Sequence, residues 1–143
     1  MADLSRTLLG FDYGKKRIGV AVGQEITGSA QPLVTVHMVQ NKPDWDHITR
    51  LLEQWKPDLL IVGEPKNMDD TENDMTRAAR RFANQLNGRY NLPIALVDER
   101  LTSMEAEEII TEQRRAGRIK KKSSKAALDQ VAAQLILQTW LYQ

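Results

Sequence analysis

Apolar and polar residues alternate along the first forty positions, a pattern typical of β-strands. Residues 7–12 form an apolar run that ends at an aspartate, and residues 17–23 alternate strictly between branched apolar residues and small ones. The four residues between them have a turn sequence, so the two segments predict a β-hairpin. Apolar positions over residues 30–39 predict a third strand, which completes an antiparallel meander.

From residue 44 onward the apolar positions change their period. Apolar residues at helical spacing over 45–55 predict a helix, with Asp44 as its N-cap and Pro57 just beyond its end. Two later apolar runs are typical of buried parallel strands, and three more segments favour helices. These strands are expected over residues 58–63 and 93–97, and the helices over residues 72–88 after Thr71, from a capping box at 102–105, and from Ser123 or Ser124 to Tyr142.

The predicted order of elements is βββαβαβαα, which describes an α/β fold with a five-stranded mixed sheet and helices on both faces. A length of 143 residues fits one domain over residues 1–143, and the sequence contains no internal repeat or linker. No apolar run approaches the roughly 18–20 residues that span a membrane, and the N-terminus lacks the apolar core of a signal peptide. We therefore expect a cytoplasmic protein without a membrane partner, as a monomer or a weak dimer.

Positive charge gathers toward the C-terminal end. Residues 113–143 contain seven Lys or Arg and one acid, Asp129, whereas the rest of the chain has a net charge of −5. A basic end on a chain of net charge +1 favours phosphate binding, although an ordinary solvated surface would have the same composition. The candidate phosphate contacts are Lys15, Lys16, Arg17, Arg77, Arg81, Lys120, Lys121, Lys122 and Lys125.

Acidic residues end two of the predicted strands. Asp12 ends the first strand and Glu99 follows the last one, and sites in open α/β sheets collect at the carboxyl ends of strands. The chain has no cysteine and two histidines, so any metal must be held mainly by oxygen ligands. Such ligands suit hard cations such as Mg²⁺ or Mn²⁺. For Asp12 by itself, a simple turn role is equally consistent.

Asp129 is an acid in the middle of a predicted helix, where aspartate has poor propensity. Residues 126, 132 and 133 are alanines, so this face of the helix is smooth enough to lie close against a sheet. A carboxylate on such a face needs a cation or a metal beside it. The alternative is an ion pair with Lys125, one helical turn away. Together with Asp12 and Glu99, Asp129 could hold the two cations, about 3.5–4 Å apart, that phosphodiester hydrolysis uses.

Four segments of the chain resemble, in order, the motifs of the YqgF/RuvX family. They are Gly10–Ala21, Ile61–Asp69, Val97–Ser103 with Glu105 and Ala106, and Lys125–Leu137. The resemblance implies an RNase H-like fold and a metal-dependent nuclease that uses Mg²⁺ or Mn²⁺ in a two-metal site. It places the catalytic and metal-binding acids at Asp12, Glu99 and Asp129.

The resemblance implies two substrates that the residues themselves do not separate. Family members resemble nucleases that mature the 5′ end of precursor 16S rRNA, and an older interpretation makes them Holliday junction resolvases that act on branched DNA. This chain departs from the family pattern at Glu64, where leucine is typical, and at Asp70, where glycine is typical. Glu64 could join the metal site as a fourth carboxylate, or it could turn outward into solvent.

Two other classes of protein are compatible with parts of the sequence. A non-catalytic nucleic-acid-binding module would keep the basic segment but would not need Asp129 in an apolar helix. Sugar kinases, actin and Hsp70 share a phosphate loop of the G-x-D-x-G type, but they grip a nucleotide between two such domains. A chain with one domain favours the nuclease.

Overall fold

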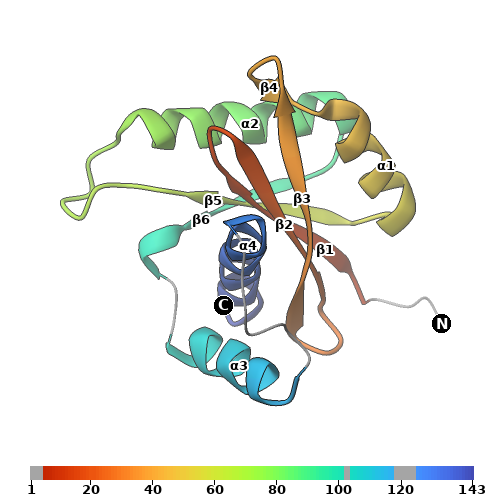
Figure 1. Ribbon diagram of the computed structural model, residues 1–143, viewed down its shortest axis with the longest axis vertical. Helices are drawn as coiled ribbons and strands as arrows, with labels where there is room; N and C mark the ends of the chain where they lie inside the picture. The colour runs from red at the N-terminus through yellow and green to blue at the C-terminus, as the bar shows by residue number, and fades with distance from the viewer. Residues whose placement is uncertain (1–4, 102–103, 118–124) are drawn as a thin grey trace.

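The computed structural model describes residues 5–101, 104–117 and 125–143 and shows a six-stranded mixed sheet within these ranges (Figure 1). The strand order is β4-β3-β2-β1-β5-β6. The strands are β1 (Thr7–Tyr13), β2 (Arg17–Gln24), β3 (Ser29–Val39), β4 (Lys42–Pro43), β5 (Leu59–Glu64) and β6 (Ile94–Asp98). The sheet has one strand more than predicted, because β4 has two residues and is too short to show an alternating pattern.

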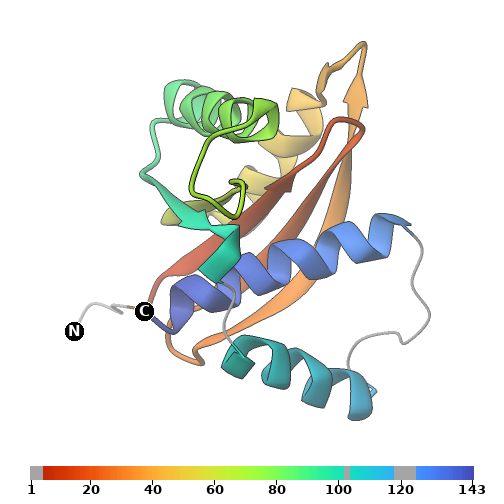
Figure 2. The ribbon, with the colours of Figure 1, turned by 90° about the vertical axis from the view of Figure 1, so that its left-hand side faces the viewer.

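Helices cover both faces of this sheet (Figure 2). α1 (Trp45–Trp55) and α2 (Asp74–Tyr90) lie on one face, and α4 (Lys125–Leu141) crosses the other. α3 (Met104–Arg115) contacts α4, and a short 3-10 helix, η1 (Glu99–Leu101), follows β6. No helix in the described ranges combines the length and apolar content needed to cross a membrane.

The helix caps match the sequence prediction in one case and correct it in another. Asp44 caps α1, and its carboxylate accepts a hydrogen bond from the His47 backbone N–H at 3.2 Å. α2 begins two residues later than expected, because Asn73 and Thr76, rather than Thr71, form its capping box. The predicted caps of the last two helices, Thr102, Ser103, Ser123 and Ser124, lie outside the described residues.

Alternation along the strands divides the core into two layers. β1 pairs antiparallel with β2 and parallel with β5, which pairs parallel with β6. One set of side chains, including Phe11 and Val62, packs with Phe82 beneath α1 and α2. The alternate set, including Leu8 and Ile61, packs against Leu137 of α4. Residues that face α4 therefore occupy every second position of each strand.

Small residues on the α4 face let this helix approach the sheet closely. A Cβ at Gly10 would lie 2.9 Å from the Cβ of Leu137 and 3.2 Å from the backbone oxygen of Ala133. Gly23, on the small face of residues 17–23, makes a similar contact, because a Cβ there would lie 3.0 Å from Leu137 Cδ2. Two buried glutamines complete the contact: Gln138 accepts from the Ala30 N–H at 3.0 Å, and Gln134 donates to the Ala30 carbonyl at 2.9 Å.

Candidate active site

Asp12 and Glu99 meet at the carboxyl edge of the sheet although their strands are not neighbours. β5 lies between β1 and β6, so Glu99 must reach across it. The residue of β5 in its path is Gly63, where a Cβ would lie 2.6 Å from Glu99 Oε1. The missing side chain at Gly63 therefore lets the carboxyl groups of Asp12 and Glu99 hydrogen-bond to each other.

Burial raises the pKa of both carboxyl groups of this pair. Desolvation raises the pKa of Asp12 to about 8, with further contributions from the Glu99 charge, the hydrogen bond to Glu99 and the Asp129 charge. Desolvation also raises the pKa of Glu99, the hydrogen bond with Asp12 opposes that rise, and the Asp98 charge adds to it. A divalent cation between the two carboxylates would neutralise both charges and so remove the repulsion between them.

A cavity of about 210 Å³ opens beside the two carboxyl groups. Asp12 and Glu99 line it on the sheet side, and Ala132, Leu135 and Ile136 of α4 form the opposite wall. Oxygen ligands against an apolar wall suit a hard cation, since the wall offers no competing soft or nitrogen donor. The donor set and the space therefore fit Mg²⁺ or Mn²⁺.

Asp129 lies near this pair but is bound to an arginine. Arg17 Nε donates to Asp129 Oδ2 at 2.6 Å, and both side chains are about a quarter exposed. The ion pair considered from sequence had Lys125 as the partner, whereas the structure shows Arg17. Among the described residues no group of three acidic, histidine or cysteine side chains is arranged to hold a metal. Two of the three predicted acids are thus in contact, and the third is paired with Arg17.

Glu64 faces the other side of the sheet. It follows Leu60 and Val62, which pack beneath α2, and its carboxylate accepts from Arg80 Nε at 2.5 Å. Lys66 Nζ lies 3.4 Å from its second oxygen, and Glu64 is 7% exposed. Glu64 therefore neither turns into solvent nor points toward the face that carries Asp12.

The two departures from the family pattern belong to one ion network. Lys66 Nζ lies between Glu64 and Asp70, 3.8 Å from Asp70 Oδ1. Arg100 donates to Asp70 at 2.7 Å and also to Asp98. The hydrogen bonds from Arg100 to Asp98 lower the pKa of Asp98 to about 2. The network ties the segment after β5 to the turn that carries Glu99.

The predicted phosphate contacts divide between the two faces. Lys15 and Lys16 are exposed in the turn between β1 and β2, and Lys125 is exposed at the start of α4. The start of α4 is hydrogen-bonded to Thr35, which lies in the same row of paired strand residues as Asp12 and Gly19. Arg77 and Arg81 are exposed on α2, and Arg77 pairs with Asp74 at 2.5 Å. Lys120, Lys121 and Lys122 lie outside the described residues.

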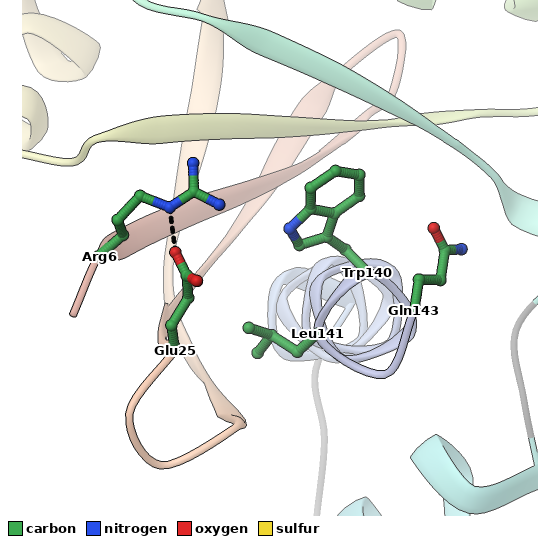
Figure 3. A pocket seen from close by; sticks show the side chains of 5 residues that line it. All are labelled: Arg6, Glu25, Trp140, Leu141 and Gln143. Atoms are coloured by element: carbon green, nitrogen blue, oxygen red, sulfur yellow. Dashed lines mark hydrogen bonds and ion pairs between the residues drawn. The ribbon is translucent and has the colours of Figure 1, made fainter. Parts of the chain in front are cut away.

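A second hollow, of about 260 Å³, lies at the opposite edge of the sheet (Figure 3). Arg6 and Glu25 form an ion pair on one side of it, and Trp140, Leu141 and Gln143 line the end of α4. It contains one carboxylate, already neutralised by an arginine. We therefore place the candidate chemistry at the smaller cavity beside Asp12.

Sequence analysis did not single out Gly63 or the pairing of Arg17 with Asp129. A glycine at the end of a buried apolar strand was a usable signal for Gly63, because such glycines permit close approach. The Arg17–Asp129 contact joins residues 112 positions apart. No local pattern in the sequence predicts it.

Comparison with known structures defines the class of fold. The structure of Thermus thermophilus RuvC matches with a TM-score of 0.59 at 16% identity, covering 95% of this chain and 94% of that chain. The same protein in complex with Holliday junction substrate matches with a TM-score of 0.58 at 14% identity, covering 96% and 94% of the two chains. The fold is thus the RNase H-like fold of RuvC-type resolvases, as expected, with six strands in the described residues where five were predicted.

Sequence comparison narrows the class to one family. The family model RuvX, described as Holliday junction resolvase, matches residues 6–143, and the chain belongs to this family. A relative from Nitrosococcus oceani is 53% identical over 138 residues, covering 95% of this chain and 86% of its own. One from Aeromonas salmonicida is 49% identical over 137 residues, covering 96% and 95%. Both relatives bear the name "Putative pre-16S rRNA nuclease".

Proposed function

We propose that this protein is a metal-dependent nuclease whose metal ligands are Asp12, Glu99 and Asp129. The observation that carries the proposal is the direct contact of Asp12 and Glu99 beside an open cavity. Two partly buried carboxyl groups held together are costly unless a proton or a cation neutralises them. The contact of two carboxyl groups across an intervening strand therefore supports a cation site at this point.

Each acid has a definite part in the proposed site. Asp12 and Glu99 supply carboxylate oxygens from the sheet, and Asp129 supplies a third from α4. Divalent cations held there would activate the attacking water and stabilise the leaving oxygen of a phosphodiester. Lys15, Lys16 and Lys125, exposed along the same edge, would bind the flanking phosphates and orient the nucleic acid.

We propose precursor 16S rRNA as the substrate, with cleavage during maturation of its 5′ end. The names of the two relatives support this choice, since both match this chain over most of its length. A second candidate is a four-way DNA junction. The family description and the fold shared with RuvC favour it.

The test is a cleavage assay on precursor 16S rRNA and on a four-way DNA junction, each with Mg²⁺, with Mn²⁺ and with chelator. We expect cleavage of the precursor near its 5′ end in the presence of metal. Asp12→Asn, Glu99→Gln and Asp129→Asn should each lower the rate more than about a hundredfold, beyond the 10–100-fold that outer-shell partners of a metal cost.

Asp74→Asn is the matched control, because Asp74 is an exposed acid on α2 and lies on the other face of the sheet. Its rate should equal that of the parent. Cleavage of the junction and not of the RNA would select the second candidate. Binding of either nucleic acid without any cleavage would show a non-catalytic module, and full activity of Asp129→Asn would remove that residue from the site.

A further inference from the structure

Arg17 has one partner predicted from the sequence, a nucleic-acid phosphate, and a different partner in the structure, Asp129. Its place at the end of the β1–β2 turn, beside exposed Lys15 and Lys16, suits a contact to nucleic-acid phosphate. In the structure its Nε donates instead to Asp129 at 2.6 Å. Asp129 is in turn one of the three proposed metal ligands.

The backbone fixes this contact from both sides. Arg17 and Gly19 are two residues apart on β2 and so point to the same face, which is the face that α4 covers. The backbone oxygen of Asp129 lies against Gly19, which brings the first turns of α4 directly over the strand. The Arg17 guanidinium and the Asp129 carboxylate are therefore held together by the packing of the helix on the strand.

We propose that Arg17 changes partner when nucleic acid binds, and that this exchange releases Asp129 to the metal. The inference rests on the proposed function, since it takes Asp129 as a metal ligand. In the free protein Arg17 neutralises Asp129. With substrate bound, a phosphate takes the guanidinium, and the Asp129 carboxylate turns to the cation beside Asp12 and Glu99.

Electrostatic interactions favour this exchange of partners when nucleic acid binds. A guanidinium in contact with Asp129 repels a divalent cation approaching the same carboxylate, so Arg17 lowers the metal affinity of the free protein. A phosphate is a good bidentate partner for arginine, and both side chains are about a quarter exposed, so the phosphate can reach Arg17. Each ligand then strengthens binding of the other, and the effect must be reciprocal. Metal would be held tightly only where a substrate phosphate is present.

The test measures Mn²⁺ binding by electron paramagnetic resonance, which needs no activity. The full chain is titrated with Mn²⁺ as the parent, as Arg17→Gln and as Arg50→Gln, with and without a 20-nucleotide RNA, and Mn²⁺ bound by RNA in the absence of protein is subtracted. Arg50→Gln is the matched control, because it makes the same substitution at an exposed arginine of α1, on the face of the sheet opposite α4. A gel run after each titration records the integrity of the RNA.

Without RNA, we expect Arg17→Gln to bind Mn²⁺ about fivefold or more tightly than the parent, at the lower end of typical couplings between sites. Arg50→Gln should bind Mn²⁺ as the parent does. RNA should raise the Mn²⁺ affinity of the parent about fivefold or more, and this increase should be largely absent in Arg17→Gln. The proposal is overturned if Arg17→Gln binds Mn²⁺ no more tightly than Arg50→Gln, or if RNA raises the Mn²⁺ affinity of Arg17→Gln as much as that of the parent.

A second measurement uses the unaltered protein, so it does not depend on the folding of a variant. The Nε–H resonance of Arg17 in ¹H–¹⁵N NMR should shift when RNA is added without metal, and an unchanged resonance would also overturn the proposal.

Mn²⁺ binding by Asp12→Asn separates this inference from the proposed function. If Asp12→Asn leaves Mn²⁺ binding intact, the proposed metal site is wrong and the exchange falls with it. If binding depends on Asp12 but not on Arg17, the exchange is wrong and the metal site stands.

Discussion

The backbone carbonyl of Asp129 lies against Gly19, so closely that a Cβ at position 19 would overlap it. Gly19 pairs with Asp12 across the β1–β2 ladder. The contact therefore determines the distance between the start of α4, which carries Asp129, and the row of paired strand residues that contains Asp12. The absence of a side chain at one position of β2 thus determines how closely the backbone at Asp129 approaches the sheet.

Gly19→Ala should destabilise the protein and push the start of α4 away from the sheet. The added methyl group meets backbone rather than a flexible side chain, so it cannot be relieved by a rotamer change. We expect a loss of about 1–3 kcal/mol in the free energy of unfolding, the usual range for overpacking. Urea denaturation of parent and variant gives this value.

Gly88→Ala serves as the control for that substitution. Gly88 lies within α2, and a Cβ there would meet nothing within 4 Å. Alanine is the better helix former, so this variant should gain about 0.5–1 kcal/mol. Equal stability of the two variants would mean that α4 does not depend on close contact at Gly19.

The buried glutamines of α4 provide a second prediction. Gln138 accepts from the Ala30 N–H at 3.0 Å and donates to the Gly28 carbonyl at 2.7 Å. Gln138→Leu would leave the buried Ala30 N–H and the partly buried Gly28 carbonyl without this partner, so we expect a loss of about 1–3 kcal/mol in the free energy of unfolding. Gln85→Leu, on the exposed surface of α2, should change it by less than about 0.5 kcal/mol. If the two substitutions have equal effects, Gln138 does not stabilise β3.

The sequence predicts those features that depend on periodicity and on strand ends. The alternation in residues 17–23 locates β2 and its small face, and acids at two strand ends indicate that Asp12 and Glu99 converge. Alanines around Asp129 indicate a helix face that packs closely on the sheet. Each of these signals lies within one element or at its boundary, which is why the sequence is sufficient to detect them.

Contacts between elements that are far apart in the sequence cannot be predicted from local sequence patterns. The partner of Asp129 is Arg17 rather than the nearby Lys125, because the path of α4 across the sheet decides it. Glu64 accepts a hydrogen bond from Arg80 on α2, and the loop between β5 and α2 brings these two residues together. The predicted cap at Thr71 failed for a local reason: Asn73 and Thr76 satisfy each other's backbone groups and so begin the helix later.

The Glu64–Arg80 pair should show measurable coupling in a double-mutant cycle. Glu64 is nearly buried, so Arg80→Met would leave its charge with Lys66 at 3.4 Å as the remaining partner. We expect a coupling energy of about 1–2 kcal/mol between Glu64→Leu and Arg80→Met, within the range for residues in one ion network. The same cycle on Asp74 and Arg77, an exposed pair, should give less than about 0.5 kcal/mol.

Additive effects at Glu64 and Arg80 would show that the pair contributes no specific stability. A metal titration of Glu64→Leu tests the other interpretation of this residue. Because Glu64 faces α2, the metal concentration for half-maximal cleavage should match that of the parent. An increase of several-fold would bring Glu64 into the metal site as a fourth carboxylate.

The basic segment between α3 and α4 should contribute to nucleic-acid affinity by binding phosphates. Changing Lys121 and Lys122 to Gln removes two charges from it. For each phosphate that is no longer neutralised, the slope of log K against log salt concentration should fall in magnitude by roughly 0.7 for single-stranded RNA.

Changing Arg50 and Lys56 to Gln is the control, because it removes the same charge from α1 and its C-cap, on the face opposite α4. We expect this control to keep the parent slope in filter-binding titrations between low and moderate salt. If both pairs of substitutions lower the slope equally, the effect reflects net charge, and the segment has no specific part in binding.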